Sequence, residues 1–503
     1  MPAGPSSGSS TQPDFMTFKH DTDPAKPVLV LFRHDLRVAG NAALTAAAGS
    51  GKPVIPVFVR ETGGPRFRAP GAAWLWWLHH SIAALSKSLE SLGANLVLRS
   101  GRQRDIMESL IEETGADMVL WNRRYDPAGM EADTDIKAAL KDRDLHAESF
   151  SGALLHEPWQ LKTGSGGYYK VYSPFWRAFS ADFTLQAPPP APRSLRAYDG
   201  PVTSEALDDW RLLPTRPDWA GGLREAWTPG EAEAHRLLEA FLDGAIDGYR
   251  DERDRPDIES TSRLSPYLAH GEISPAQIFQ AIADRETIDA REKDIEHFRK
   301  EVGWREFSYH LLFHNPDLAT KNFNSDFDAF PWGPIGDRLE KWQKGETGYP
   351  IVDAGMRQLW ETGWMHNRVR MAAASFLIKH LRVHWHHGEA WFWDTLVDAD
   401  PANNAASWQW VAGSGADAAP YFRIFNPILQ GEKFDTEGNY VRRFVPALKD
   451  MPADRIHKPW QASKSVLDKA GVTLGKTYPE PLVDHQQARD SALEAYKTMR
   501  GEA

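Results

Sequence analysis

The segment PVLVLFRHDLR, residues 27–37, decides how the first half of the chain folds. Its first six residues, 27–32, are apolar without interruption, which is typical of a strand buried on both faces of a parallel sheet. The polar run RHDLR at 33–37 follows directly. Because open parallel sheets bind ligands beyond the carboxyl ends of their strands, this run is expected at the ligand-binding edge of such a sheet.

The same apolar signal recurs downstream, separated by helical stretches. Further strands are expected at 54–59 (VIPVFV), 95–100 (NLVLRS) and 117–122 (DMVLWN), with helices at 73–92 and 104–114. Alternating strands and helices predict an α/β domain built on an open, doubly wound parallel sheet with helices on both faces.

The second half of the chain has a different pattern. From Pro229 onward the strand signals disappear, and helical periodicity occurs at 231–242, 275–282, 297–314, 349–363 and 366–383. The proline-rich run APPPAPR at 187–193 breaks any regular structure before that. We therefore predict a disordered tail at 1–26, the α/β domain at 27–155, an inter-domain connector at 156–228 and an all-α domain at 229–503.

Composition excludes several classes of protein. No apolar run is long enough to span a bilayer and no secretory signal opens the chain, so a cytoplasmic protein is expected. The absence of cysteine among 503 residues excludes disulfides, thiolate nucleophiles and cysteine-ligated clusters. A net charge of −11 argues against a uniformly basic surface but leaves room for one local basic groove. The 20 tryptophans invite a role in aromatic stacking or electron transfer besides core packing.

Two segments combine groups that suit a ligand, although each also has an ordinary structural interpretation. Thr261, Ser262 and Ser265 precede a short helix, where hydroxyl groups suit a phosphate but more often only cap the helix. Glu301 and the pair Trp304 and Arg305 share one helical face, because they are three and four residues apart. A carboxyl group beside an indole and a guanidinium can bind a nucleobase. The simpler alternative is a core tryptophan beside a surface ion pair.

Two later segments leave similar alternatives open. Asn367, Arg370 and Met371 fall on one helical face of GWMHNRVRM at 363–371. The loop DADPANNAASWQW at 398–410 contains Asp398, Asp400 and Asn404, so that it either binds a cation or forms an Asx turn that caps the next helix. The histidine-rich run KHLRVHWHH at 379–387 lacks the carboxylate of a recognised metal motif, and we expect no metal site.

Taken together, these segments closely resemble the photolyase/cryptochrome family, and most of all its bacterial photolyases for cyclobutane pyrimidine dimers. The resemblance lies in TSRLSPYLAHGEISP (261–275), WREF (304–307), GYPIVDAGMRQLWETGWMHNRVRM (348–371) and WQWVAGSGADAAPYFRIFNPILQGEKFD (408–435). LFRHDLRVAGNAAL at 31–44 is similar to the first strand and turn of the family. The resemblance implies an α/β antenna domain and a helical domain that binds FAD.

The resemblance also implies roles for individual residues. The positions expected around the FAD phosphates are Tyr249, Thr261, Ser262, Leu264 and Ser265, with Arg305 nearby, and those around the rest of the cofactor are Asn367, Arg370, Asp398 and Asp400. Asp398 is expected to pair with Arg370 beside the flavin ring. Asn404 matches the residue that faces flavin N5, where a neutral amide tolerates the anionic reduced flavin that repair requires.

The implied reaction is light-driven repair of cyclobutane pyrimidine dimers in UV-damaged DNA by an electron from excited, reduced FAD. The damaged dinucleotide leaves the base stack to reach the flavin. Expected DNA contacts are Arg253, Arg368, Arg423 and Gln430, and expected lesion-pocket residues are Glu301, Trp304, Met371 and Trp410. Glu301 and Asn404 are the expected catalytic residues, and Glu301 is expected to be protonated, or to become so during turnover. Trp408, Trp385 and Trp332 match the positions of an electron relay from flavin to surface.

The antenna domain departs from the best-known folate-binding pattern of the family. NRRYDPAGMEAD at 122–133 has Ala128 and Gly129 where an Asn-Glu pair is expected, and Trp176 stands where a DNA-contacting lysine is common. A second chromophore is expected, with methenyltetrahydrofolate bound in a Trp-rich manner as the first choice and a deazaflavin as the second. The protein is expected to be a monomer without an obligate protein partner.

Three other functions stay open at this point. A cryptochrome photoreceptor is disfavoured by Asn404 and by the short tail that follows the resemblance near residue 460. A (6-4) photolyase of the iron–sulfur type is excluded by the absence of cysteine, and the animal type requires lesion-pocket histidines that EVGWREF at 301–307 lacks. The third is a protein that binds FAD or DNA without enzymatic activity.

Overall fold

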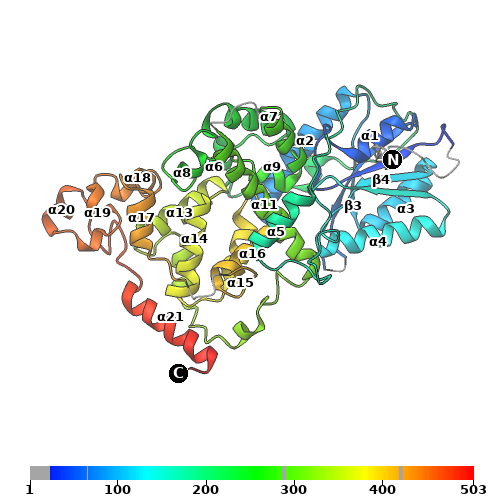
Figure 1. Cartoon of the computed structure of the whole chain (residues 1–503). Helices are drawn as coiled ribbons and strands as arrows, with labels where there is room; N and C mark the ends of the chain where they lie inside the picture. The colour runs from blue at the N-terminus through cyan, green and yellow to red at the C-terminus, as the bar shows by residue number, and fades with distance from the viewer. Residues whose placement is uncertain (1–22, 65, 286–290, 419–422, 503) are drawn as a thin grey trace, which may run out of the picture.

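A computed structural model describes residues 23–64, 66–285, 291–418 and 423–502, and its two halves lie side by side (Figure 1). Most of the tail expected at 1–26 lies outside the described residues. Within the described ranges, no helix is long and apolar enough to cross a membrane.

The N-terminal half is built on a five-stranded sheet. Its strands are β1 (Val28–Phe32), β2 (Val54–Glu61), β3 (Val97–Gly101), β4 (Met118–Asn122) and β5 (His146–Phe150), in the order β3-β2-β1-β4-β5. All neighbouring strands run parallel, and Val28 is in register with Val54 on one side and Met118 on the other. The four strands predicted from apolar runs are confirmed. The half-buried edge strand β5, with the sequence HAESF, carried no such signal.

Helices cover both faces of this sheet, as predicted. They are α1 (Ala42–Gly49), α2 (Ala72–Ser91), α3 (Gln103–Thr114) and α4 (Pro127–Asp142). Alternate side chains of β1 enter two separate cores, because successive residues of a strand point to opposite faces. Val28 and Val30 pack with residues of α1 and α2, whereas Leu29 and Leu31 pack with residues of α3 and α4.

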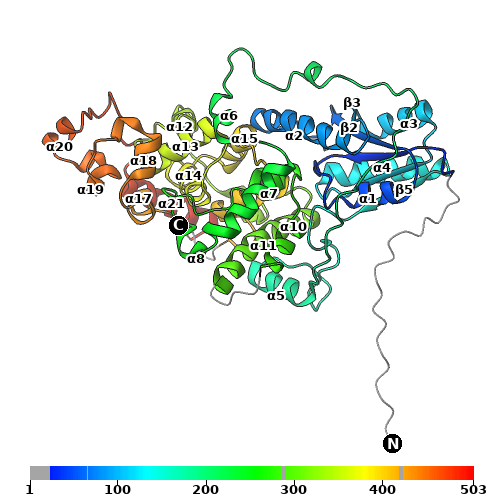
Figure 2. The ribbon, with the colours of Figure 1, turned by 90° about the horizontal axis from the view of Figure 1, so that it is seen from above.

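The segment between the two halves is not entirely loop. It contains α5 (Tyr172–Asp182) and α6 (Gly221–Ala226), and the chain between these helices runs along the outside of the α/β half (Figure 2). The α5 helix packs against the helical half, so that it contributes side chains close to the cavity described below.

The C-terminal half is helical, as predicted. Its α-helices are α7 (Glu231–Ala240), α8 (Tyr249–Glu252), α9 (Ser265–His270), α10 (Pro275–Ala283), α11 (Glu292–His314), α12 (Arg338–Gln343), α13 (Pro350–Thr362), α14 (Asn367–Ser375), α15 (Trp385–Thr395), α16 (Pro401–Ala412), α17 (Pro427–Phe434), α18 (Asn439–Phe444), α19 (Ala453–Ile456), α20 (Lys464–Lys469) and α21 (His485–Arg500). Short 3-10 turns occur at η1 (Leu207–Trp210), η4 (Ser325–Ala329), η6 (Pro446–Leu448) and η7 (Pro459–Gln461), and π-helical turns at η2 (Phe241–Ala245) and η5 (Phe376–His380). The helical stretch expected at 366–383 is therefore interrupted after Ser375 by a π-helical turn.

Helix α2 joins the two halves. Trp77 Nε1 and Ser81 Oγ both donate to the fully buried carboxyl group of Glu272, at 3.0 and 2.6 Å. Burial raises the pKa of Glu272 to about 8, so that at neutral pH a mostly protonated, uncharged group fills this interface. Trp74 also stacks on the ring of His270, with a centroid distance of 4.5 Å. These contacts fix the α/β half against the wall of the cavity.

Candidate functional site

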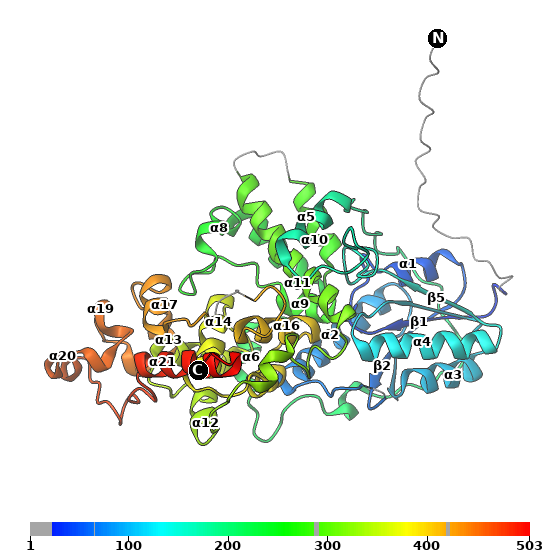
Figure 3. The ribbon, with the colours of Figure 1, turned by 60° about the horizontal axis from the view of Figure 1, so that its bottom comes forward.

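A cavity of about 740 Å³ opens in the helical half. Helices α11, α14 and α16 lie side by side (Figure 3), and all three contribute lining residues, as do α8 and α9. Its volume lies within the range of cofactor and ligand sites in proteins, and its surface combines apolar side chains with convergent polar groups.

Most of the site residues predicted from the sequence meet in this cavity. Its lining includes Tyr249, Ser262, Leu264, Ser265, Arg305, Asn367, Arg370, Asp398, Asp400 and Asn404 from the expected cofactor set; Arg253, Glu301, Trp304, Arg368, Met371 and Trp410 from the expected DNA set; and Trp408. Thr261, Arg423, Gln430, Trp385 and Trp332 are not among its lining residues. Residues distant in the sequence therefore form one site.

The ion pair expected between Arg370 and Asp398 is present. Arg370 Nη2 donates to Asp398 Oδ2 at 2.8 Å, and Arg370 Nε donates to the carbonyl oxygen of Met365 at 2.7 Å. The Asp398 side chain is only 3% exposed, and its second oxygen, Oδ1, is buried without a hydrogen-bond donor among the described residues. Because buried carboxylate oxygens are almost always hydrogen-bonded, this atom suits a ligand that carries an N–H or O–H donor.

The loop that precedes α16 is an Asx cap. Asp400 Oδ1 accepts from the backbone N–H groups of Ala402 and Asn403, at 3.0 and 2.7 Å, and Tyr309 Oη donates to Asp400 Oδ2 at 2.7 Å. Asp398 is engaged with Arg370, and no three potential metal-ligating side chains cluster within the described ranges. Of the two alternatives for this loop, the geometry favours the cap, which also directs Asn404 into the cavity.

The hydroxyl-rich segment before α9 does not cap that helix through its side chains. Leu264 occupies the N-cap position and makes no side-chain capping bond, so the ordinary capped-helix interpretation is wrong. Ser265 Oγ instead accepts from Trp364 Nε1 at 3.2 Å, and both Ser262 and Ser265 line the cavity. Hydroxyl groups next to backbone N–H groups at this wall suit the phosphates of a nucleotide cofactor.

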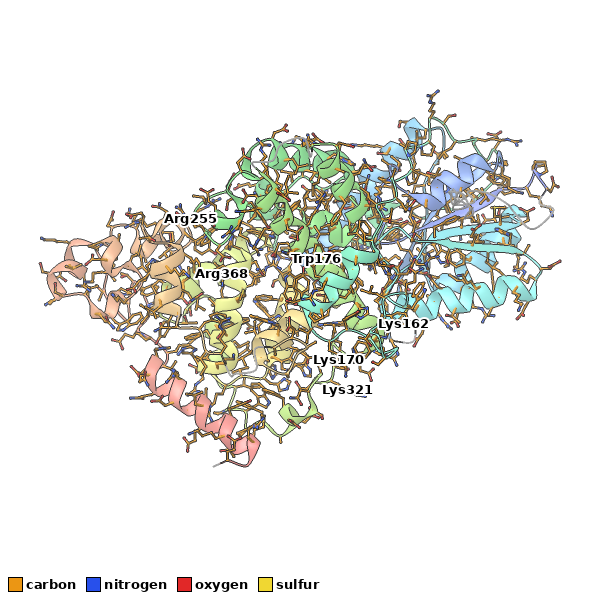
Figure 4. All side chains as sticks on the ribbon, viewed as in Figure 1. Lys162, Lys170, Trp176, Arg255, Lys321 and Arg368 are labelled. Atoms are coloured by element: carbon orange, nitrogen blue, oxygen red, sulfur yellow. The ribbon has the colours of Figure 1, made fainter. Side chains whose placement is uncertain are left out.

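The two arginines expected to contact DNA at the cavity are paired with carboxylates. Arg253 forms a bidentate ion pair with Glu301, in which Nη2 lies 2.7 Å from Oε2. Arg368, labelled in Figure 4, has its Nη2 2.5 Å from Asp254 Oδ2, and its guanidinium lies over the ring of Phe434. The Glu301 carboxylate thus faces the Arg253 guanidinium, and the protonation of Glu301 that was expected during repair stays a prediction.

Helix α5 packs two aromatic residues against α11 behind the cavity wall. Sequence analysis did not single out Tyr172, and it noted Trp176 only as standing where a DNA-contacting lysine is common. Tyr172 stacks on Trp304, and Trp176 (labelled in Figure 4) lies one helical turn later against Gly303 of α11. A Cβ atom at Gly303 would lie 2.4 Å from Trp176 Cζ3, so that only glycine permits this approach. The aromatic cluster in YYKVYSPFW at 168–176 is the signal in the sequence that points to these contacts.

The three tryptophans of the expected relay differ in burial. Trp408 lines the cavity, and a Cβ at Gly388 of α15 would lie 2.1 Å from its Cη2 atom. Trp385 is fully buried, and Trp332 is partly exposed. The ring of His384 contacts both of these, with centroid distances of 5.7 Å to Trp385 and 4.7 Å to Trp332.

The polar run after β1 was expected at the carboxyl edge of the sheet, where such sheets bind ligands, and it lies there. Its charged groups engage the protein: Arg33 pairs with Asp133 and donates to the carbonyl oxygen of Asn122. Arg124 likewise pairs with Glu61 and Asp126. These ion pairs also lie at the carboxyl edge of the sheet. The buried groups of RHDLR thus organise the turn after β1.

Comparisons with known proteins agree with this architecture. The model for the DNA photolyase family matches residues 28–193, and the model for the FAD-binding domain of DNA photolyase matches residues 298–498. A deoxyribodipyrimidine photo-lyase of Agrobacterium fabrum is 58% identical over 475 residues, which cover 94% of this chain and 98% of that protein. Cryptochrome-2 of Arabidopsis thaliana is more distant, at 36% identity over 94% of this chain and 79% of the relative.

Solved structures agree as well. The crystal structure of a bacterial class III photolyase from Agrobacterium tumefaciens superimposes with a TM-score of 0.91 at 56% identity, and the match covers 96% of this chain and 100% of that one. The matched FAD-binding domain includes α14, α16 and most of α11, whereas the lining residues of α8 and α9 precede the matched range. From its fold, its site and these relatives, the chain belongs to the photolyase/cryptochrome family.

Proposed function

We propose that this protein is a deoxyribodipyrimidine photolyase, which uses blue light and bound FAD to split cyclobutane pyrimidine dimers in DNA. One observation carries the proposal: the expected FAD-binding residues, except Thr261, line the same cavity as the expected lesion-binding residues. An electron donated by a cofactor in this cavity would reach a base held at its mouth without leaving the protein.

The cavity suits FAD. Ser262 and Ser265 lie where hydroxyl groups can bind the phosphates, and Tyr249 and Arg305 line the same region. Asn367, Arg370, Asp398 and Asn404 surround the rest of the cofactor, and the orphaned Oδ1 of Asp398 accepts a hydrogen bond from it. FAD supplies light absorption and one-electron chemistry, whereas the protein binds it, orients it and excludes water. Asp400 acts through the cap that positions α16.

The lesion binds at the mouth of this cavity. A dimer is poorly stacked, so that it leaves the helix at lower cost than normal bases do, and this difference gives selectivity. Trp304, Met371 and Trp410 provide an apolar pocket, and Glu301 provides a carboxyl group for the carbonyl edge of the pyrimidines. Arg253, Arg368, Arg423 and Gln430 contact the DNA. Once DNA phosphates draw Arg253 away, Glu301 becomes free to take up a proton and to stabilise the negative charge on the dimer.

Trp408, Trp385 and Trp332 are proposed to carry electrons from the surface to oxidised FAD. The support is their graded burial: Trp408 borders the cavity, Trp385 is buried, and Trp332 is partly exposed. This route would restore the reduced cofactor. It is separate from repair, in which the electron given to the dimer returns to the flavin.

A second, light-harvesting chromophore is also proposed, with methenyltetrahydrofolate as the first choice and a deazaflavin as the second. Trp360 supports the folate, because its indole is 62% exposed and parallel to that of Trp391, with a 4° interplanar angle. Such a flat surface suits a stacked pterin ring. Mass spectrometry of the small molecules released on denaturation distinguishes the two. We further propose that the protein acts as a cytoplasmic monomer, which light scattering and cell fractionation can test.

The decisive experiment is blue-light repair by pre-reduced protein of an oligonucleotide with one thymine dimer, beside a matched oligonucleotide with one (6-4) lesion. Repair of the dimer alone is expected. Repair of only the (6-4) lesion would make the protein a (6-4) photolyase. Repair of neither, with FAD bound, would contradict the proposal and favour a cryptochrome-type photoreceptor or a protein without repair activity.

A further inference from the structure

An ion pair between the two halves of the protein lies next to the cavity. Arg68, in the loop between β2 and α2, donates from Nη1 and Nη2 to the two carboxylate oxygens of Glu389 on α15, at 2.7 and 2.8 Å. The Glu389 side chain is 5% exposed, whereas that of Arg68 is 38% exposed. Such a two-point guanidinium–carboxylate contact holds the carboxylate in one orientation.

The segment that carries Arg68 is itself fixed to α15. Trp393 Nε1 donates to the carbonyl oxygen of Ala69 at 2.9 Å, and the guanidinium of Arg68 lies 4.1 Å from the centre of the Trp393 ring. The backbone N–H of Ala72 donates to Asp394 Oδ1 at 3.0 Å. Gly71 allows this close approach, because a Cβ atom there would lie 2.1 Å from the carbonyl oxygen of Trp393. Arg68 is therefore held in place from three sides.

Glu389 in turn determines the orientation of the Asn404 amide. Asn404 Nδ2 donates to Glu389 Oε1 at 2.8 Å and lies 3.1 Å from the carbonyl oxygen of the same residue. Both partners are acceptors only, so the amino group, and not the carbonyl group, must face Glu389. No donor among the described residues reaches Asn404 Oδ1, and Asn404 lines the cavity. The side chain therefore offers the cavity a hydrogen-bond acceptor.

We propose that Arg68 and Glu389 are positioning residues that hold Asn404 with its Oδ1 toward the cofactor and thereby favour the reduced flavin over the oxidised one. This inference rests on the proposed function, because it takes the ring of FAD to lie beside Asn404. Reduced flavin carries a hydrogen on N5, which an amide oxygen accepts, whereas oxidised flavin presents a lone pair at N5, which the same oxygen repels. A rotated amide would invert this preference.

Arg68 has a second effect in the same arrangement. An ionised Glu389 without a counter-charge would place a negative field near a cofactor that is itself anionic when reduced. The guanidinium neutralises that field while the hydrogen bond to Asn404 is kept. A residue of the α/β half thus contributes to the redox preference of a cofactor bound in the helical half.

The test compares Arg68→Ala, Glu389→Ala and wild-type protein, each purified with FAD. The equilibrium between oxidised and reduced flavin is measured by redox titration, and reoxidation of the reduced protein is followed in air in the dark. Loss of a charge-assisted hydrogen bond is expected to shift this equilibrium away from reduced flavin by about tenfold or more. For a two-electron couple this corresponds to a fall in reduction potential of about 30 mV. Dark reoxidation should accelerate in both variants.

Two controls separate positioning from general damage. Arg66→Ala removes a nearby exposed arginine whose partners are Glu131 and Asp317, and it should leave the potential unchanged. Arg68→Lys restores the positive charge without the two-point contact, so that its potential should fall between those of Arg68→Ala and wild type. A purely structural role would lower thermal stability or FAD content in the variants but leave the potential of the bound flavin unchanged.

The inference is overturned if Arg68→Ala and Glu389→Ala retain the wild-type potential and reoxidation rate. Should Glu389→Ala fail to fold, the comparison of Arg68→Ala, Arg68→Lys and Arg66→Ala decides, because these side chains lie at the surface. The redox measurement does not depend on repair activity. Wild-type protein that repairs no dimer would contradict the proposed function. Unshifted potentials in the variants of an enzyme that repairs dimers would contradict only this inference.

Discussion

Tyr172 of α5 lies parallel to Trp304 of α11, with ring centroids 3.7 Å apart and an interplanar angle of 10°. Tyr172 Oη also donates to the carbonyl oxygen of Lys300 at 2.7 Å, and its backbone N–H donates to Asp417 Oδ2 at 3.1 Å. The indole of Trp304 lines the proposed lesion pocket. The segment between the two halves thus supports this indole on the side away from the pocket.

Replacing this support should weaken lesion binding. A stacked aromatic pair contributes about 0.5–1.5 kcal/mol, so Tyr172→Leu is expected to reduce affinity for dimer-containing DNA by about 2- to 10-fold. Tyr172→Phe keeps the ring and loses only the hydrogen bond to Lys300, and it should bind nearly as well as wild type. Fluorescence anisotropy with damaged and undamaged oligonucleotides measures the effect. Equal affinities in Tyr172→Leu and wild type would show that Trp304 needs no support.

Removing Asp398 should release FAD. Without its partner, Arg370 leaves an uncompensated charge at the cavity, and breaking a buried pair in this way costs about 3–5 kcal/mol. FAD content per protein, measured by absorbance after gel filtration, should fall strongly in Asp398→Ala. Asp398→Asn retains an oxygen acceptor and should lose less. Full FAD content in Asp398→Ala would count against the assignment of this cavity.

Replacing Trp408 should separate photoreduction from repair. Trp408→Phe is expected to slow the photoreduction of oxidised FAD strongly, because the indole that borders the cavity is the first member of the proposed relay. Repair by chemically pre-reduced protein should remain nearly intact, since repair recycles its electron. Trp410→Phe, measured without DNA, provides a comparison within the same helix. Unchanged photoreduction in Trp408→Phe would require another route, for example through Trp410 or Trp393.

Two variants at the mouth of the cavity should change DNA affinity in opposite directions. Arg368→Ala is expected to weaken binding and to reduce the slope of log K against log salt by about 0.9 for one lost phosphate contact. Asp254→Asn removes the carboxylate that pairs with Arg368, so that it should strengthen binding. Binding titrations at several salt concentrations measure both. An affinity that does not vary with salt would exclude a phosphate-binding groove.

Glu301 should influence the efficiency of repair more than the binding of substrate. Loss of one donor to a developing oxyanion costs about 10²–10³ in rate in other enzymes, and a short-lived anion should be less sensitive. Glu301→Ala is therefore expected to keep FAD and lesion binding but to repair with a clearly lower quantum yield. Glu301→Gln can still donate a hydrogen bond and should lie between the two. A wild-type yield in Glu301→Ala would remove this residue from the mechanism.

Several features of the protein could be read from the sequence because they depend on local patterns. Uninterrupted apolar runs predicted β1, β2, β3 and β4, since a strand covered on both faces must be apolar throughout. Helical periodicity predicted α10, α11 and α13, because one face of each is buried. Asn367, Arg370 and Met371 were expected on one face from spacing alone, and all three line the cavity.

Only the tertiary structure decided which polar groups meet. The half-polar edge strand β5 and the interruption after Ser375 left no clear local signal. The pairs of Arg253 with Glu301, Arg68 with Glu389 and Tyr172 with Trp304 join segments that lie far apart in the chain. Periodicity reports which face of an element is buried, whereas the partner of a charge or a ring depends on how separate elements pack. The sequence therefore indicated what the cavity contains, and packing determined the orientation of each group within it.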